Sequence, residues 1–125
     1  MAYILVVDDE EPIREILLRR LTSWGHQVTA ARTADEALTI MESAPAPIVF
    51  SDLIMPVHDG LWLMERVKER WPQTIFVVVS GAEDLANVTK TRKLGAVDYV
   101  PKPVGREMLR QALDRALAAA GLAGQ

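Results

Sequence analysis

Short apolar runs alternate along the chain with longer segments of helical periodicity. Each run has four or five residues and few polar positions, which is typical of a strand buried on both faces of a parallel sheet. The expected strands are residues 3–7, 28–31, 48–51, 75–79 and, with a weaker pattern, 97–100. Strands that alternate with helices predict an α/β fold with helices on both faces of the sheet, because crossovers between parallel strands are right-handed.

The segments between these runs carry helix boundary signals. Pro12 suits the first turn of a helix, and Gly25 suits the residue that follows its end. Thr33 and Glu36 have the spacing of a capping box at the start of a second helix. Further helices are expected over residues 60–71, about 84–94 and about 104–119.

Length and composition indicate one folded domain. The chain has 125 residues, of which 50% are hydrophobic and 25% charged, with seven glycines and seven prolines. We expect a domain over residues 1–120 and a flexible tail of small residues over 121–125. The tail would fray or begin a linker, so the chain is either a stand-alone protein or the amino-terminal part of a longer one.

Charge and residue content exclude several classes of protein. Fourteen basic and seventeen acidic residues give a net charge of −3 without a Lys/Arg run, so direct nucleic-acid binding is not expected. The lack of cysteine excludes disulfides, thiolate nucleophiles and cysteine-based metal centres, and two histidines are too few for a histidine-rich one. The apolar runs are far shorter than the roughly 20 residues that span a bilayer, and no basic signal segment opens the chain. A cytoplasmic protein without a membrane partner is expected.

Polar side chains follow the ends of the apolar runs. Asp8 and Asp9 follow the first, Asp52 the third and Ser80 the fourth, and Lys102 lies just beyond the fifth. The carboxyl ends of parallel strands share one edge, where ligands bind, so these side chains should converge. Neighbouring carboxylates require a cation, and Mg²⁺ is the natural one for oxygen ligands. Together with a lysine they describe a phosphoryl-transfer site, with Asp52 as the best candidate nucleophile.

Four sequence segments carry a combination of motifs over nearly the whole chain. They are VVDDE at residues 6–10, DLIMPVHDG at 52–60, SG at 80–81 and GAVDYVPKP at 95–103. Together they resemble the receiver domain of response regulators in two-component signalling, over about residues 3–117. The resemblance implies a flavodoxin-like (βα)5 fold, whose five-stranded parallel sheet has the order 2-1-3-4-5. It also implies a signalling switch that is activated by phosphorylation.

The resemblance assigns roles to the acidic residues. Asp52 would accept a phosphoryl group from a sensor histidine kinase, a phosphotransfer protein or a small phosphodonor. Asp9 would bind Mg²⁺ directly and Asp8 largely through water. Asp52 and the main-chain carbonyl of Ile54 would complete the protein's metal ligands.

Further roles implied by the resemblance concern the switch. The hydroxyl of Ser80 and the ammonium of Lys102 would contact oxygens of the phosphoryl group, and the Lys102–Pro103 bond would be cis. Tyr99 would be the switch aromatic that follows Ser80. The surface of the fourth helix, fifth strand and fifth helix would then change. Its partner would be a downstream protein, an output domain in a longer parent chain, or a second copy in a homodimer.

Three residues near the expected site are given structural roles. His58 is expected to be exposed, because a histidine is a poor ligand for Mg²⁺, and Asp59 to shape the turn before Gly60. Trp62 shares its helix stripe with polar residues and should be wet, with its ring over Arg66. A role of Trp62 in a partner or self-association surface remains the alternative.

Phosphate loss from Asp52 is expected to be slow. Ile54 and Ala82, each two positions after a site residue, carry no group that could orient an attacking water.

Two other classes of function remain open at this point. A Mg²⁺-dependent phosphohydrolase could use Asp52 as nucleophile on external substrates, but such enzymes usually place a second acid where Ile54 stands. A flavin-binding protein of the same fold would have a loop rich in glycine and hydroxyl groups after the first strand. The acidic residues 8–10 would repel its phosphate.

Overall fold

Five parallel strands alternate with five helices in the part of the chain that the computed structural model describes, residues 2–81 and 85–122. The sheet has the order β2-β1-β3-β4-β5, so the expected flavodoxin-like (βα)5 fold is confirmed. The strands are β1 (Tyr3–Val7), β2 (Gln27–Ala31), β3 (Ile48–Asp52), β4 (Ile75–Ser80) and β5 (Asp98–Pro101). The helices are α1 (Glu11–Ser23), α2 (Ala34–Ser43), α3 (Gly60–Arg70), α4 (Leu85–Lys93) and α5 (Arg106–Ala119).

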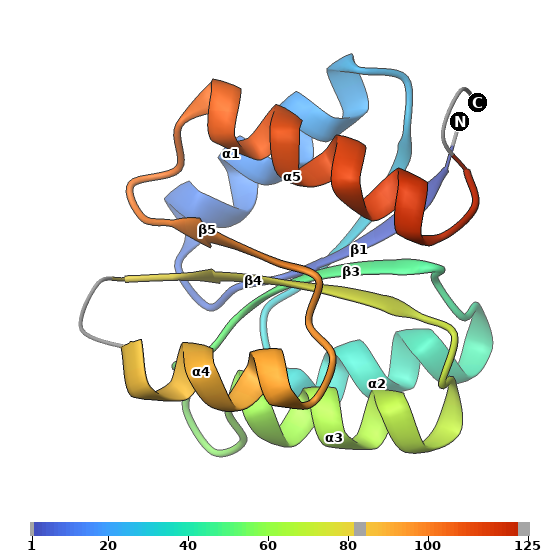
Figure 1. Cartoon of the computed structure of the whole chain (residues 1–125), viewed down its shortest axis with the longest axis vertical. Coiled ribbons are helices and arrows are strands. Elements are labelled where there is room, and N and C mark those ends of the chain that lie inside the picture. The colour runs from blue at the N-terminus through green and yellow to red at the C-terminus, as the bar shows by residue number, and fades with distance from the viewer. Residues whose placement is uncertain (1, 82–84, 123–125) are drawn as a thin grey trace.

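The helices form two layers around the sheet. α1 and α5 cover one face, and α2, α3 and α4 cover the other (Figure 1). Alternate residues of β1 serve the two faces, since Ile4 and Val6 belong to the core beneath α1 and α5, whereas Leu5 and Val7 belong to the core above α2 and α3. The apolar strands are therefore buried on both sides, as their sequence pattern predicts.

Most expected boundaries lie within one or two residues of the observed ones. Thr33 caps α2 by accepting a hydrogen bond from the Glu36 amide at 3.0 Å, but the Glu36 carboxylate accepts from the amide of Arg32, so the capping box is not reciprocal. α5 begins two residues later than expected, because Gly105 has extended backbone and serves as its N-cap. The expected flexible tail is wrong for its first two residues, since the Leu122 amide donates to the Leu117 carbonyl at 2.7 Å and the Leu122 side chain packs against the core. The expected start of the fourth helix near residue 84 and the end of the expected tail, 123–125, lie outside the described residues.

The register of the strands brings their polar ends to one edge of the sheet. Val7 lies opposite Ser51, and Asp52 lies opposite Val79, so the residue after β1 and the last residue of β3 are at the same level. Ser80 lies opposite Pro101, which directly precedes Lys102. Parallel pairing thus places Asp8, Asp52, Ser80 and Lys102 at the carboxyl edge. Tyr99 lies further back, within β5 and opposite Val78.

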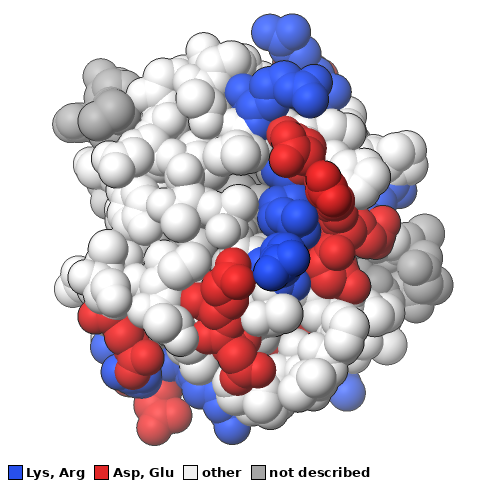
Figure 2. All heavy atoms as spheres, turned by 180° about the vertical axis from the view of Figure 1, so that it is seen from behind, with Lys and Arg blue, Asp and Glu red and all other residues white. Residues whose placement is uncertain are grey.

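The surface carries charges of both signs. Figure 2 shows the face turned away from the viewer of Figure 1, where Lys and Arg side chains lie beside Asp and Glu side chains without a wide area of one charge. Among the described helices, none has the length and apolar character required to cross a bilayer.

Candidate functional site

Four carboxylates meet at the carboxyl edge of the sheet. Asp8, Asp9, Glu10 and Asp52 each present an oxygen, and these oxygens all lie within 4.8 Å of one another. Asp8 and Asp52 are buried, whereas Asp9 and Glu10 are exposed. The expected convergence of Asp8, Asp9 and Asp52 is therefore observed, and the cluster is open to solvent on one side.

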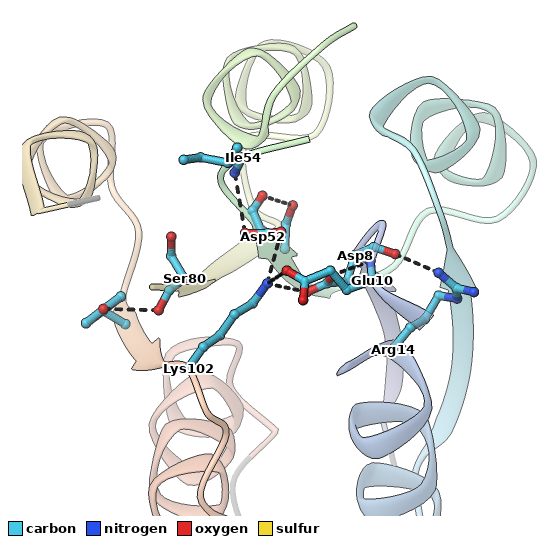
Figure 3. A network of polar contacts seen from close by, with 9 residues as sticks. Asp8, Glu10, Arg14, Asp52, Ile54, Ser80 and Lys102 are labelled. Atoms are coloured by element: carbon cyan, nitrogen blue, oxygen red, sulfur yellow. Dashed lines mark hydrogen bonds and ion pairs between the residues drawn. The ribbon is translucent and has the colours of Figure 1, made fainter. Parts of the chain in front are cut away.

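Lys102 reaches into this cluster from the loop after β5. Its Nζ lies 3.1 Å from Asp52 Oδ2, 3.1 Å from Glu10 Oε1 and 3.2 Å from Asp8 Oδ2 (Figure 3). The amide of Lys102 donates to the carbonyl of Ser80 at 2.9 Å, which fixes the start of this loop against β4. The Lys102–Pro103 bond is cis, as the resemblance implied.

Burial and mutual repulsion shift the pKa values of the buried groups. Burial, with a further contribution from Asp8, raises the pKa of Asp52 to about 6, although Lys102 opposes this shift. Burial also raises the pKa of Asp8, against the hydrogen bond from the Glu10 amide and the charge of Lys102. Burial alone would lower the pKa of Lys102, but Asp8, Glu10 and Asp52 reverse this and raise it. Lys102 is therefore charged at neutral pH, whereas the raised pKa of Asp52 lies much closer to neutral pH than that of an ordinary aspartate.

The donor set fits a hard divalent cation. Asp8 Oδ1 accepts a hydrogen bond from the Glu10 amide at 2.8 Å. Among the described residues, the buried Asp8 Oδ2 has no hydrogen-bond partner and forms an ion pair with Lys102. One lysine cannot neutralise four carboxylates, and every side-chain atom that the cluster offers as a metal ligand is an oxygen. Oxygen ligands around an uncompensated negative charge are the preferred surroundings of Mg²⁺. The Ile54 amide donates weakly to Asp52 Oδ1 at 3.4 Å, which places the Ile54 main chain beside this cluster.

Ser80 and Tyr99 connect the neighbouring strand end to β5. Ser80 is buried as the last residue of β4. The Tyr99 hydroxyl donates to the carbonyl of Ser80 at 3.1 Å and to that of Gly81 at 3.4 Å. The half-buried Tyr99 side chain therefore contacts the main chain of Ser80 and of the residue that follows it.

Two residues of the network, Glu10 and Arg14, received no role in the sequence analysis. Glu10 binds Lys102, and Arg14 Nη1 donates to the carbonyl of Asp8 at 2.9 Å (Figure 3). Glu10 is the N-cap of α1, and Arg14 lies in its first turns. The sequence contained one indication of their role. A helix is expected to begin directly after Asp8 and Asp9, so its first turns, with Glu10 and Arg14, lie at the carboxyl edge of the sheet.

The surroundings of His58 differ from the expectation. The His58 side chain is only 37% exposed, because its ring stacks on Trp62 and its Nδ1 lies 3.1 Å from Asp35. Trp62 is half-buried rather than wet, and the guanidinium of Arg66 lies 4.4 Å from its ring centre, so the predicted contact with Arg66 is confirmed. Asp59 shapes the turn as expected, since its carboxylate accepts from the Trp62 amide at 2.8 Å and caps α3.

The fold and this edge define a class, a flavodoxin-like α/β domain with an acidic pocket and a lysine beyond its strand ends. Residues 4–114 match the family described as the response regulator receiver domain. The chain belongs to this family, whose members are the phosphorylation-activated switches of two-component signalling.

Several relatives of known identity are similar to the chain. The DNA-binding transcriptional regulator NtrC of Klebsiella pneumoniae is 32% identical over 112 residues, which are 90% of this chain and 24% of that protein. A putative response regulator NtrX-like protein of Rickettsia felis is 32% identical over 115 residues, again 90% of this chain and 24% of that protein. The chain thus spans about a quarter of the length of these curated relatives.

Solved structures show the same similarity in three dimensions. A response regulator receiver domain protein from Clostridium thermocellum superposes with a TM-score of 0.91 at 30% identity and covers 98% of both chains. NtrX from Brucella abortus also gives a TM-score of 0.91, at 32% identity, over 97% of this chain and 28% of that one. These comparisons support the signalling switch and give no support to a phosphohydrolase that acts on external substrates.

Proposed function

We propose that Asp52 is the phosphoacceptor of this receiver domain and that Asp8, Asp9, Ser80 and Lys102 assist the transfer. The observation that carries the proposal is the position of the Lys102 ammonium, 3.1 Å from Asp52 in a pocket where Asp8 Oδ2 has no hydrogen-bond partner. The pocket holds more negative charge than its lysine compensates. It is therefore suited to a cation and a phosphoryl group together.

The transfer forms an acyl phosphate on Asp52. An oxygen of the Asp52 carboxylate attacks phosphorus, and the bond from phosphorus to the donor breaks, with its electron pair leaving on the donor. The donor is a phosphohistidine of a sensor kinase or phosphotransfer protein, or a small acyl phosphate. Lys102 neutralises charge on the phosphoryl oxygens, and the hydroxyl of Ser80 donates a hydrogen bond to one of them.

Mg²⁺ is the proposed cofactor. Asp8, Asp9, Asp52 and the main-chain carbonyl of Ile54 would hold the ion, which supplies positive charge to the transferring phosphoryl group. The buried oxygen of Asp8 without a hydrogen-bond partner supports this assignment.

The proposed output is a changed surface of α4, β5 and α5. The Tyr99 hydroxyl contacts the carbonyls of Ser80 and Gly81, so a movement of Ser80 toward the phosphoryl group would alter the surroundings of Tyr99 on β5. Tyr99 is accordingly proposed as the switch residue together with Ser80.

The wider setting is proposed on the same basis. Residues 1–120 would form the receiver domain, in a cytoplasmic protein that catalyses only its own phosphorylation and dephosphorylation. Its partners would be a sensor histidine kinase or phosphotransfer protein and, for output, a downstream protein, an output domain in a longer parent chain, or a second copy of the chain.

Intact mass measurement tests the phosphoacceptor. Wild-type protein incubated with acetyl phosphate and Mg²⁺ should gain the mass of one phosphoryl group, and should gain none without metal. The Asp52→Asn variant should remain unmodified, whereas Asp114→Asn, which changes an exposed carboxylate on α5, should react as wild type does. Equal modification of wild type and Asp52→Asn would exclude Asp52.

A further inference from the structure

The segment between β3 and α3, residues 53–59, contains a strained backbone. Val57 has φ 70°, a left-handed conformation that a β-branched residue rarely adopts, and it is 90% exposed. Such a conformation persists only where the neighbouring structure holds it. The same segment carries Ile54, whose main-chain carbonyl is a proposed metal ligand, so the contacts that hold this segment bear on the site.

His58 fastens this segment to two helices. Its Nδ1 lies 3.1 Å from each carboxylate oxygen of Asp35, in the first turn of α2. Its ring lies parallel to that of Trp62 on α3, with an interplanar angle of 4° and ring centroids 3.7 Å apart. The residue after Val57 is therefore held from two sides, although Val57 itself is almost fully exposed.

Trp62 is held in turn by its own helix. Arg66 lies one turn further along α3, with its guanidinium carbon 4.4 Å from the Trp62 ring centre and its Nη1 donating to the Trp62 carbonyl at 3.3 Å. His58, which lies before α3 begins, and Arg66, which lies within α3, therefore both contact the Trp62 ring. Arg66 holds the ring on which His58 stacks, but in the described part of the chain no hydrogen bond or ion pair joins Arg66 to the loop residue His58.

The other end of the segment is tied to the site itself. The Gly60 amide donates to the Leu53 carbonyl at 2.7 Å, and the Ile54 amide donates to Asp52 Oδ1 at 3.4 Å. His58 is not part of the acidic cluster, so any effect it has on that cluster passes through the main chain of this segment.

We propose that His58 is a positioning residue for the metal site: its clamp between Asp35 and Trp62 holds residues 53–59, and with them the Ile54 main chain, in the conformation that binds Mg²⁺. This inference rests on the proposed function. Without the clamp, residues 53–59 have to become ordered when Mg²⁺ binds. The free energy required for this ordering lowers the affinity for Mg²⁺. Asp35 and His58 both keep part of their side chains exposed, so removal of the clamp should leave the buried core intact.

A comparison of two alanine variants tests the clamp. His58→Ala should weaken Mg²⁺ binding about threefold to tenfold, measured by magnesium titration followed through amide chemical shifts. This is less than the roughly 10–100-fold cost of removing a direct outer-shell partner of a metal ligand, because His58 acts only through the main chain of residues 53–59. Arg66→Ala is the matched control, because it removes another partner of the same ring that belongs to α3 and not to residues 53–59, and it should bind Mg²⁺ as wild type does. His58→Phe retains a stacking ring and His58→Gln retains a polar group for Asp35, so each should restore part of the affinity.

Amide hydrogen exchange in metal-free protein gives a second readout. Exchange over residues 54–59 should accelerate in His58→Ala and not in Arg66→Ala. Equal Mg²⁺ affinity of His58→Ala and wild type, or an equal loss in both alanine variants, would overturn the inference. Failure of Asp52 to gain a phosphoryl group in a wild type that still binds Mg²⁺ would count against the proposed function alone, since the affinities of the variants are measured without a phosphodonor.

Discussion

The ammonium nitrogen of Lys102, just after β5, lies 3.1 Å from Oδ2 of Asp52, the last residue of β3, although the two residues are 50 positions apart. The two residues belong to the same carboxyl edge of the sheet, and the Lys102 side chain reaches across the end of β4, which lies between β3 and β5. The lysine compensates part of the charge of a pocket built from four carboxylates. The buried acid therefore has a raised pKa despite its cationic neighbour, and this has measurable consequences.

The first prediction concerns stability without metal. Burial raises the pKa of Asp52 from 3.8 to about 6, so the folded protein binds more protons than the unfolded chain between these two values. A raised acid pKa lowers stability as pH rises through this window, and the loss is complete at pH 7. Asp52→Asn should therefore raise the free energy of unfolding at pH 7 by about 1–3 kcal/mol, from the size of the pKa difference.

Denaturant unfolding at several pH values in a chelating buffer measures this effect. The advantage of Asp52→Asn should shrink as the pH falls from 7 toward 4, because the wild-type carboxyl then becomes neutral as well. The exposed control Asp114→Asn should show no such trend. An advantage that stays constant over this range would contradict the raised pKa.

A second prediction concerns the stabilising effect of Mg²⁺. A ligand that binds only the folded state raises the free energy of unfolding, by about 2.7 kcal/mol at 100 times its dissociation constant. Mg²⁺ should do so for wild type, as seen in thermal unfolding, and much less for Asp9→Asn. Because Asp9 is exposed, its substitution removes a proposed ligand without opening the core. Equal stabilisation of both proteins would place the ion elsewhere.

The third prediction concerns the close approach of Gly60 to β3. A Cβ at Gly60 would lie 2.1 Å from the main-chain carbonyl oxygen of Asp52, which is not a movable side-chain end. Gly60→Ala should therefore destabilise the fold by roughly 2–3 kcal/mol and displace the start of α3. Gly105→Ala is the matched control, because a Cβ there meets nothing within 4 Å.

Chemical denaturation compares these two glycine variants. The alanine at 105 loses a little capping preference but lowers the conformational entropy of the unfolded chain, and these opposite effects should keep the net change within about 0.5 kcal/mol. A Gly60→Ala protein as stable as wild type would show that the loop before α3 can shift freely.

Local sequence pattern was sufficient for the alternation of strands and helices and for the convergence of polar side chains at one edge, whereas the strand order was implied by the family resemblance. Asp8, Asp52 and Ser80 each stand at the end of an apolar run, and parallel strands bring such ends to one edge whatever the loops do. The contact of Trp62 with Arg66 could also be predicted, since residues four apart on a helix are neighbours.

Contacts between segments distant in sequence could not be predicted in this way. Asp35 and His58 are 23 positions apart and meet because α2 and α3 lie side by side, which no periodicity encodes. The left-handed backbone of Val57 is likewise invisible in the sequence, because it is imposed on a residue that disfavours it. Glu10 was visible as an acid next to the site, but its bond to Lys102 depends on where the loop after β5 turns.

The last prediction concerns the lifetime of the phosphorylated protein. Ile54 is 54% exposed at the rim of the pocket, and its side chain has no group that could orient a water toward the acyl phosphate of Asp52. Water positioning is one of the few contributions a protein makes to this hydrolysis, so purified phosphoprotein should lose phosphate slowly. The second position with the same expected effect, Ala82, lies outside the described residues.

Substitution of Ile54 tests this expectation directly. Ile54→Asn places an amide at the pocket rim and should shorten the lifetime by about threefold or more, followed by intact mass after removal of phosphodonor. Val57→Asn is the matched control, because it makes the same loop more polar at a residue that is 90% exposed and whose left-handed backbone asparagine tolerates. A wild-type lifetime of seconds, or equal lifetimes of wild type and Ile54→Asn, would show that hydrolysis does not depend on a group at this position.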